Sequence, residues 1–383
     1  MLRFLTAGES HGPGLVAIVE GLPAGLEVSG DRIATELGRR RMGAGRGGRM
    51  DIEQDQLEVL GGIRFGRTLG GPVAVVVRNT EWSRWAAEMS PEPGSSQRLL
   101  TAPRPGHADL AGMQKYDTHD ARDILERSSA RETAARTVAG TLAKIYLEEI
   151  GVSVLSHVLA IGPVVVTRKD PPGPDALDQI DASPVRTLDK EAEAGMLAEI
   201  ARAHEKRDTL GGVVEVVVYG LPPGIGSHVH WDRKLDGLLA GAVMSIPAIK
   251  GVEIGDAGNV AASYGSSAHD EIRYEGGGFA RATNRAGGIE GGMTNGEPVI
   301  VRAAMKPLST LMEPLDSVDV VTKEPTEAFR ERSDVCSVPA AGVVAEQMVA
   351  FVLAAEVTRM FGGDTIDEVK KRVGDYRDRL ERF

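Results

Sequence analysis

Cysteine is almost missing from this chain, with one residue, Cys336, among 383. A single thiol excludes an internal disulfide and fits a reducing compartment. No apolar run approaches the roughly 20 residues of a membrane span, and the N-terminus enters patterned sequence without a signal peptide. These absences predict a cytoplasmic protein with no membrane partner.

Basic charge and aromatic residues are also scarce. The net charge is −11 and aromatics make up 4% of the chain. Proteins that bind nucleic acids carry extended basic surfaces, often with aromatic side chains, so this composition argues against a nucleic-acid partner. A hydrophobic content of 42% with 26% charged residues is typical of a soluble globular protein.

Several familiar motifs are absent as well. There is no GxxxxGK[ST] phosphate loop, no GxGxxG between a strand and a helix, and no GxSxG nucleophile turn. His228 and His230 alternate with Asp232 as on a strand, but no further ligand has metal-like spacing. The sequence therefore predicts no metal site and no Rossmann nucleotide site.

What the chain does have is glycine, at 47 residues, and five arginines within residues 39–49. Like charges crowded in this way repel one another, and the interleaved glycines weaken a helix that would separate them. Guanidinium groups grip phosphate and carboxylate in a forked geometry. The cluster therefore indicates a site for a small polyanion.

The sequence also repeats itself. Residues 14–18, 21–25 and the helix expected from Asp31 resemble residues 212–218, 220–224 and the helix expected from Asp232. A glycine-rich block at residues 61–73 recurs without a gap at 287–299, an offset of 226. This pattern predicts two pseudo-repeats, about 1–160 and 206–370, within a single domain, with an inserted excursion at about 163–205 that holds an exposed helix near Lys190–His204.

Each half ends in an Arg-Ser pair followed by a long apolar helix. Arg127-Ser128 precedes a helix expected over about 129–149, and Arg332-Ser333 precedes one that ends at Gly362. β-branched strands such as 73–77 and 213–218 complete an α+β fold, with helices packed against mainly antiparallel sheets. A site is expected between the halves, where the two Arg-Ser segments converge.

Two histidines lie in loops suited to ligand contact. His11 lies in GESHGPG (residues 8–14) and His107 in RPGHAD (residues 104–109). Imidazole titrates near neutral pH, so either side chain can donate a proton to a departing phosphate. The start of the first long helix, at residues 127–133, is a further anion site by its free N–H groups. Together these features indicate elimination or transfer on a phosphorylated, carboxylated small molecule.

At these residues the chain resembles the chorismate synthase family, from about residue 3 to about residue 365. The resemblance is carried by residues 8–12, 39–49, 104–109, 127–133, 287–296, 306–310 and 332–335. It implies conversion of 5-enolpyruvylshikimate 3-phosphate to chorismate and phosphate by a 1,4-elimination in the shikimate pathway. It also implies a reduced FMN cofactor with no net redox change, and a homotetramer whose subunits sandwich helices between two antiparallel sheets.

Carried over residue by residue, the resemblance implies three groups of site residues. His11 would protonate the leaving phosphate, His107 would act on the reduced flavin, and Asp334 would assist removal of the C6 proton. Substrate would be held by Arg40, Arg46, Arg49, Arg104 and Arg332. The cofactor would be held by Arg127, Ser128, Ser129, Ala130, Arg131, Pro247, Ala248, Gly291, Lys306, Pro307, Leu308, Ser309, Thr310 and Arg332.

One position departs from the family pattern, and one alternative stays open. Pro247 stands where a polar residue is common, so its side-chain contact to FMN is lost and weaker flavin binding is expected. The alternative is an FMN-dependent oxidoreductase with its own NAD(P)H site. No nicotinamide motif is visible, so supply of reduced FMN by a separate reductase, with NADPH used only there, is the favoured expectation.

Overall fold

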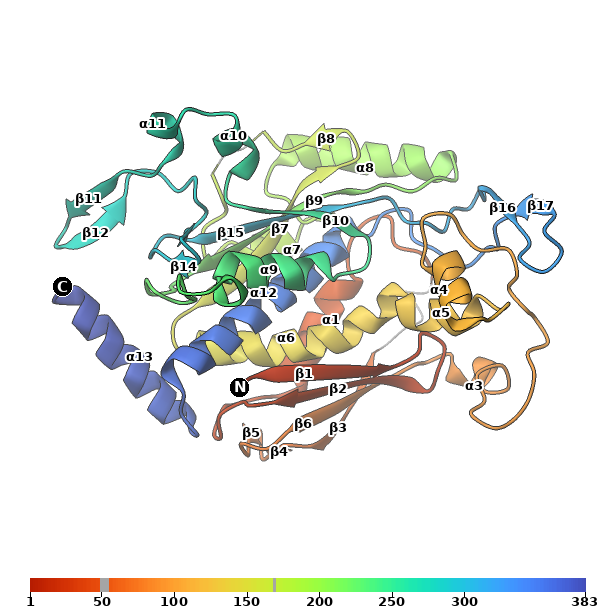
Figure 1. The fold of residues 1–383 in the computed structure, drawn as a ribbon, viewed down its shortest axis with the longest axis horizontal. Helices are drawn as coiled ribbons and strands as arrows, with labels where there is room; N and C mark the ends of the chain where they lie inside the picture. The colour runs from red at the N-terminus through yellow and green to blue at the C-terminus, as the bar shows by residue number, and fades with distance from the viewer. Residues whose placement is uncertain (49–54, 168–169) are drawn as a thin grey trace.

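The computed structural model describes residues 1–48, 55–167 and 170–383, which form two antiparallel sheets with helices between them (Figure 1). The first sheet has the order β1 (Arg3–Gly8), β2 (Gly14–Glu20), β6 (Val73–Arg78) and β3 (Gln56–Gly61). The second has the order β10 (Ile249–Ile254), β15 (Val299–Met305), β9 (Gly212–Tyr219), β7 (Ser153–Ile161) and β8 (Val164–Val165). The predicted α+β class, with helices between mainly antiparallel sheets, is confirmed.

The helical layer consists of α1 (Gly30–Arg41), α6 (Thr133–Glu148), α9 (Leu235–Met244) and α12 (Val338–Phe361). Small residues let α6 and α12 approach closely: a Cβ added at Gly140 would lie 2.3 Å from the Cβ of Gln347. By length and composition α12 could cross a membrane, but it is almost wholly buried here. It is the central core helix, which explains why it is apolar on most of its circumference.

The two sheets repeat one strand order. In the first sheet β1-β2-β6-β3 are neighbours, and in the second the corresponding run is β7-β9-β15-β10. Two short hairpins, β4 (Ile63–Arg64) with β5 (Arg67–Thr68) and β13 (Ile289–Glu290) with β14 (Met293–Thr294), lie 226 residues apart, like the glycine-rich blocks that contain them. The proposed limits of the pseudo-repeats and of the excursion stay a prediction.

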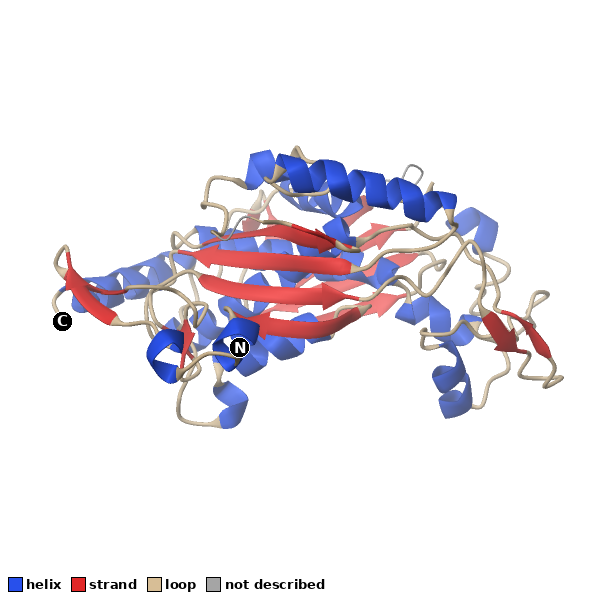
Figure 2. Ribbon diagram, turned by 90° about the horizontal axis from the view of Figure 1, so that it is seen from above, coloured by secondary structure: helices blue, strands red, loops and turns tan. Residues whose placement is uncertain are grey.

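The excursion packs α7 (Leu177–Asp181) and α8 (Lys190–Glu205) against the β7–β8 side of the second sheet, and Figure 2 shows the long helix along that edge. The expectation of an exposed helix there is wrong for one of its faces. Ala192, Met196, Ile200 and Ala203 are buried at three- and four-residue intervals, because that face packs against the sheet.

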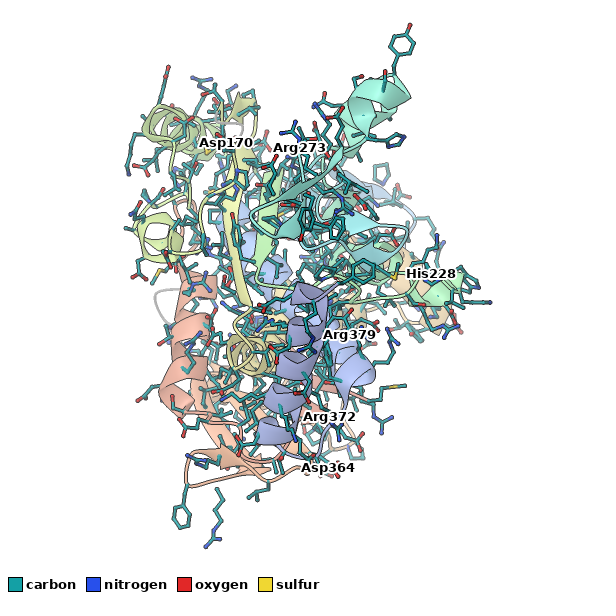
Figure 3. The ribbon with its side chains drawn as sticks, turned by 90° about the vertical axis from the view of Figure 1, so that its left-hand side faces the viewer. Asp170, His228, Arg273, Asp364, Arg372 and Arg379 are labelled. Atoms are coloured by element: carbon teal, nitrogen blue, oxygen red, sulfur yellow. The ribbon has the colours of Figure 1, made fainter. Side chains whose placement is uncertain are left out.

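Smaller elements gather at the two ends of the molecule (Figure 1). One end carries α3 (Trp82–Trp85), α4 (Asp109–Tyr116), α5 (Arg122–Ser128), the 3-10 turn η1 (Ala130–Glu132), β16 (Asp316–Val318) and β17 (Pro325–Glu327). The other carries η2 (Trp231–Arg233), α10 (Ala257–Ala261), α11 (Gly265–Ala268), β11 (Ile272–Glu275), β12 (Gly278–Arg281) and α13 (Ile366–Glu381). Figure 3 views this second end, with Arg372 and Arg379 marking α13.

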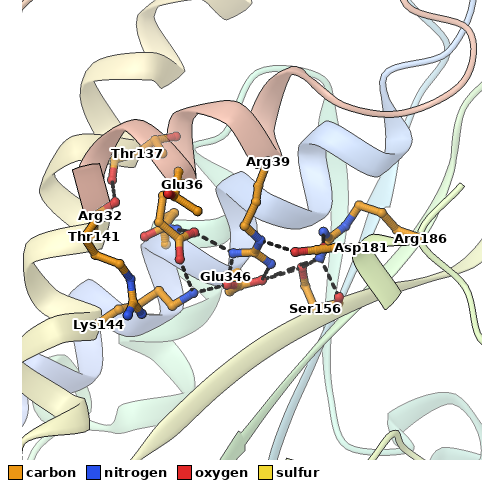
Figure 4. Close-up of polar contacts among 12 residues, drawn as sticks. Arg32, Glu36, Arg39, Thr137, Thr141, Lys144, Ser156, Asp181, Arg186 and Glu346 are labelled. Carbon is orange, nitrogen blue, oxygen red and sulfur yellow. Dashed lines mark hydrogen bonds and ion pairs between the residues drawn. The ribbon is translucent and has the colours of Figure 1, made fainter. Parts of the chain in front are cut away.

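A buried ionic cluster joins α1, α6, α12 and the excursion (Figure 4). It contains three cations and three carboxylates, namely Arg39, Lys144, Arg186, Glu36, Asp181 and Glu346. All of these side chains except the partly buried Asp181 are at most 5% exposed. The cluster joins the helices through ion pairs. Because its formal charges balance, no buried charge is left uncompensated.

Candidate active site

A cavity of about 600 Å³ lies where α6 and α12 begin. Both Arg-Ser segments reach it, so the expected convergence is confirmed. Of the residues predicted for the site, it is lined by His11, Arg40, Arg46, Arg104, His107, Arg127, Ser128, Ser129, Ala130, Arg131, Pro247, Ala248, Lys306, Leu308, Ser309, Thr310, Arg332 and Asp334. Pro307 and Gly291 are not among the lining residues, and Arg49 lies outside the described residues.

Arg40 is the unusual cation of this cavity. It lies in the last turn of α1, is 4% exposed, and donates to the Thr133 hydroxyl at 2.9 Å and the Ala130 carbonyl at 3.0 Å. Among the described residues, no atom accepts a hydrogen bond from its Nη1. Burial, with Arg131 and Arg46 nearby, lowers the pKa of Arg40 to about 9, so the group is still protonated at neutral pH. A buried cation that faces a cavity and has an unused hydrogen-bond donor is stabilised when an anion binds to it.

Arg46 and Asp334 both line the cavity and form an ion pair in its wall. Their side chains pair at 2.7 Å, and Arg46 also donates to the Ser337 hydroxyl at 2.9 Å. The backbone N–H of Gly47 donates to Asp334 at 2.7 Å. A Cβ at Gly47 would lie 2.8 Å from the Ser333 carbonyl oxygen, so only glycine allows this approach. The carboxylate thus holds the arginine loop at the cavity.

His11 is buried, at 7% exposed, rather than lying open in its loop. Its Nδ1 lies 2.8 Å from Glu126, whose other oxygen accepts the His11 backbone N–H at 2.7 Å. The Trp85 ring stands 4.1 Å away, centroid to centroid. The GESHGPG loop therefore places the imidazole in a fixed orientation at the cavity.

His107 lies in a network with Arg104 and Asp109. Its Nδ1 hydrogen-bonds the carboxylate of Asp109, which also accepts from Arg104 Nε at 2.8 Å. Arg104 donates to Thr310 at 2.8 Å and stands 4.5 Å from the Phe329 ring. Burial opposes ionisation of Asp109, but hydrogen bonds from His107 and Arg104 outweigh it and lower its pKa to about 2. Asp109 is thus an anion that fixes both neighbours.

The segment before α6 carries a capping serine, but the arginines beside it hydrogen-bond other parts of the protein. The Ser129 hydroxyl accepts the N–H of Arg131 at 3.3 Å and so caps the turn η1. Arg127 donates to the Thr6 carbonyl at 3.0 Å, and Arg131 donates to Asn79 at 3.0 Å. Arg131 also forms a buried ion pair with Asp55, so its charge is compensated within the fold, and the guanidinium groups of both arginines are engaged by the protein itself.

Two further segments complete the cavity wall. Lys306 donates to Ser309 at 2.7 Å, and the Ser309 hydroxyl donates to the Gly106 carbonyl at 2.8 Å. Burial, together with Lys250, lowers the pKa of Lys306. Arg332 donates to Glu81 at 2.5 Å. Ala248 has a φ of +69°, and its carbonyl accepts the Lys306 N–H at 2.9 Å, which joins the two segments.

Sequence reasoning missed the carboxylates behind the basic residues: Glu126, Asp109 and Glu81. Asp109 had a usable signal, because it ends the RPGHAD loop two residues after His107. Glu126 and Glu81 had none, since they lie 115 and 251 residues from their partners.

Comparison with known proteins agrees with this geometry. A model of the chorismate synthase family matches residues 2–358. Chorismate synthases of Salinispora tropica and Parafrankia sp. are 57% and 58% identical to the chain, over 99% and 98% of both sequences. A crystal structure of a chorismate synthase superposes with a TM-score of 0.81 at 41% identity, covering 100% of this chain and 99% of that one.

The chain belongs to the chorismate synthase family. It is therefore a carbon–oxygen lyase that acts on a phosphate ester, in the shikimate pathway of aromatic amino acid biosynthesis. The predicted family, fold and reaction class are confirmed. Chorismate synthases act on a small-molecule substrate, in keeping with a cavity of this volume rather than an extended binding surface.

Proposed function

We propose that the cavity binds 5-enolpyruvylshikimate 3-phosphate beside reduced FMN, and that it eliminates phosphate and the C6 proton to give chorismate. The single observation that carries the proposal is Arg40, a buried cation that hydrogen-bonds only neutral oxygens among the described contacts and whose Nη1 meets no acceptor among the described residues. A substrate phosphate or carboxylate supplies the missing partner. Arg46, Arg104 and Arg332 line the same cavity and add to its positive potential.

The residues present fit a flavin mononucleotide. The cavity joins apolar side chains, which suit a flat ring, to the hydroxyls and N–H groups at the start of α6, which suit a phosphate. The apolar set is Leu125, Ile246, Met305, Leu308 and Val344. Segments 127–131, 247–248 and 306–310 would hold the cofactor. When bound, reduced FMN supplies electron density to the conjugated system of the substrate.

His11 is proposed as the acid that protonates the departing phosphate. Its Nδ1–H donates to Glu126, so the proton that it would give to the phosphate is the one on Nε2 of the imidazolium form. Charge develops on the leaving group as its bond breaks, and the arginines stabilise that charge electrostatically. His107, held by Asp109, is proposed to stabilise the reduced cofactor through its own Nε2.

Asp334 is proposed to favour departure of the C6 proton. Three donors, from Arg46, Ser337 and the Gly47 backbone, hold its carboxylate. These contacts fix the carboxylate at the cavity, where it is proposed to assist removal of the C6 proton.

The assembly and cofactor supply follow the family pattern. We propose a homotetramer in the cytoplasm that takes reduced FMN from a separate NADPH-dependent reductase. Analytical ultracentrifugation tests the assembly, and a monomer active at assay concentrations would contradict it.

The decisive experiment is an anaerobic incubation of the protein with 5-enolpyruvylshikimate 3-phosphate and chemically reduced FMN. We expect equal amounts of chorismate and phosphate, with the flavin still reduced at the end. Absence of product from folded, flavin-bound protein would overturn the proposal. Steady NADPH consumption without the shikimate substrate would favour the alternative, an FMN-dependent oxidoreductase.

A further inference from the structure

One carboxylate holds His11 at two points. Glu126 Oε1 lies 2.8 Å from the imidazole Nδ1, and Glu126 Oε2 accepts the His11 backbone N–H at 2.7 Å. Glu126 is 3% exposed and lies on α5, while His11 lies in the loop between β1 and β2. The contact therefore fixes the position of the loop and the orientation of the ring together.

The same contact sets which ring nitrogen carries a proton. Burial raises the pKa of Glu126, but hydrogen bonds and charge from His11, with a hydrogen bond from Arg122, outweigh it, so the pKa is lowered and the carboxylate is ionised. An ionised carboxylate only accepts hydrogen bonds, so Nδ1 must donate. Nε2 is then the nitrogen left for chemistry at the cavity.

The remaining neighbours keep this pair rigid. Arg122 donates to Glu126 Oε1 at 2.9 Å and pairs with Glu331 at 3.1 Å. The Arg122 guanidinium also stands 4.8 Å from the ring of Trp85, and the same ring lies 4.1 Å from the His11 imidazole, centroid to centroid. Glu126 is thus held by Arg122, which is held in turn by Glu331, while the cavity that His11 lines also carries Arg40, Arg46, Arg104 and Arg127.

We propose that Glu126 is the positioning residue of His11: it holds the Nδ1–H tautomer, aims Nε2 into the cavity and stabilises the imidazolium form. The proposal rests on the proposed role of His11 as the acid. A carboxylate behind a catalytic histidine acts in this way in other enzymes, where its amide variant keeps the fold but favours the wrong tautomer.

The chain supplies a matched control. His157, Glu215 and Arg302 form a second group of the same composition on the second sheet, in which His157 and Glu215 are buried and Arg302 is partly buried, with Nε2 of His157 at 2.9 Å and Nε of Arg302 at 2.8 Å from Glu215. None of the three lines the cavity. Glu215→Gln therefore removes the same charge from the same kind of contact without touching the site.

The kinetic test compares Glu126→Gln, Glu126→Asp and Glu215→Gln in the flavin-loaded enzyme. We expect Glu126→Gln to lower kcat by up to about 10⁴-fold, as the amide variant behind a catalytic histidine does in a serine protease, with KM and flavin binding little changed. We also expect the alkaline limb of its pH–rate profile to move to lower pH, because the imidazolium loses its counter-charge. Glu126→Asp, which keeps the charge, should lose less, and Glu215→Gln should keep the wild-type rate.

A double mutant separates positioning from general damage. If Glu126 acts through His11, Glu126→Gln should lower kcat no further in a His11→Gln background. Equal losses in both backgrounds, an unmoved pH profile, or a loss matched by Glu215→Gln would overturn the proposal.

A readout without turnover separates this proposal from the proposed function. In the cofactor-free protein, the ¹⁵N NMR shifts of His11 should report a protonated Nδ1 in wild type and loss of that preference in Glu126→Gln. An unchanged His11 signal would overturn the positioning role even if chorismate forms. A changed signal in a protein that makes no chorismate would instead overturn the proposed function.

Discussion

Arg39 and Arg40 are neighbours on α1 and equally buried, at 4% exposed each, yet they have opposite surroundings. Arg39 pairs with Glu36 at 2.5 Å, Asp181 at 2.6 Å and Glu346 at 2.7 Å. Arg40 donates only to neutral oxygens in the described contacts, those of Thr133 and Ala130. Successive helix residues point about 100° apart, so one side chain enters the helical layer and the next enters the cavity.

The electrostatic consequences are also opposite. Burial opposes the charge of Arg39, but Glu346 and Glu36 outweigh it and raise its pKa. Burial and the nearby Arg131 and Arg46 lower the pKa of Arg40 to about 9. The first arginine pairs with carboxylates inside the fold, whereas the charge of the second is held at the cavity at a cost, in keeping with the proposal that it binds an anion. Burial alone therefore does not separate a structural charge from a functional one, and the partners do.

The largest expected effect comes from Arg39→Met. Removing the cation leaves three carboxylates with too few counter-charges, and breaking a buried pair from one side costs about 3–5 kcal/mol. Urea unfolding should show this loss in the free energy of unfolding. A loss below about 1 kcal/mol, the usual range of an exposed ion pair, would contradict the structural role of the cluster.

Arg40→Met should have little effect on stability and a large effect on activity. The Thr133 hydroxyl already donates to the Ala130 carbonyl at 2.6 Å, so neither is stranded when the guanidinium is removed. Loss of one partner of a buried charge pair costs about 2–5 kcal/mol of binding, so KM for substrate should rise at least about 30-fold. Steady-state kinetics beside urea unfolding measure both. A variant as unstable as Arg39→Met would remove the contrast.

Composition and spacing predicted the arginine-rich segment as an anion site but could not separate Arg39 from Arg40, and only the family resemblance singled out Arg40. Arg39 pairs with the carboxylates of Asp181 and Glu346, which lie 142 and 307 residues away in the sequence. Nothing in the local pattern of residues 39–49 identifies them, because pairing across such distances depends on how α1 packs against α12 and the excursion. Periodicity, in contrast, is local, which is why α6, α12 and the main strands were predicted close to their observed bounds.

The histidines show the same limit. Their glycine- and proline-rich loops predicted contact with a ligand, and both line the cavity. The burial of His11 was not predicted, since it depends on Trp85 and on Glu126, which α5 brings from 115 residues away. Family resemblance supplied the remaining roles. The role assigned to Arg49 lies outside the described residues and stays a prediction.

A smaller effect is expected on stability when an anion binds to Arg40, because Arg39 already has carboxylate partners. Inorganic phosphate should stabilise the wild-type protein by giving Arg40 its missing partner. At ten times the dissociation constant the gain is about 1.4 kcal/mol. Thermal unfolding with and without phosphate measures it, with chloride at matched ionic strength as the control. Equal stabilisation of wild type and Arg40→Met would place the anion elsewhere.

The smallest expected effect is a change with pH in which the two arginines again differ. Cations around Glu346 hold the pKa of that carboxyl below its usual 4.5 despite burial, and the pKa of Asp109 is lowered to about 2. Because both pKa values are lower in the folded state, the stability that they contribute is complete above about pH 4.5 and falls as pH drops towards 2. The urea midpoint should be flat from pH 8 to 5 and then decline.

Arg40 keeps its proton throughout this range, so the urea midpoint of Arg40→Met should decline with the wild-type slope. Glu346→Gln should decline less steeply, and equal slopes for wild type and Glu346→Gln would mean that the cluster around Arg39 contributes nothing to acid stability.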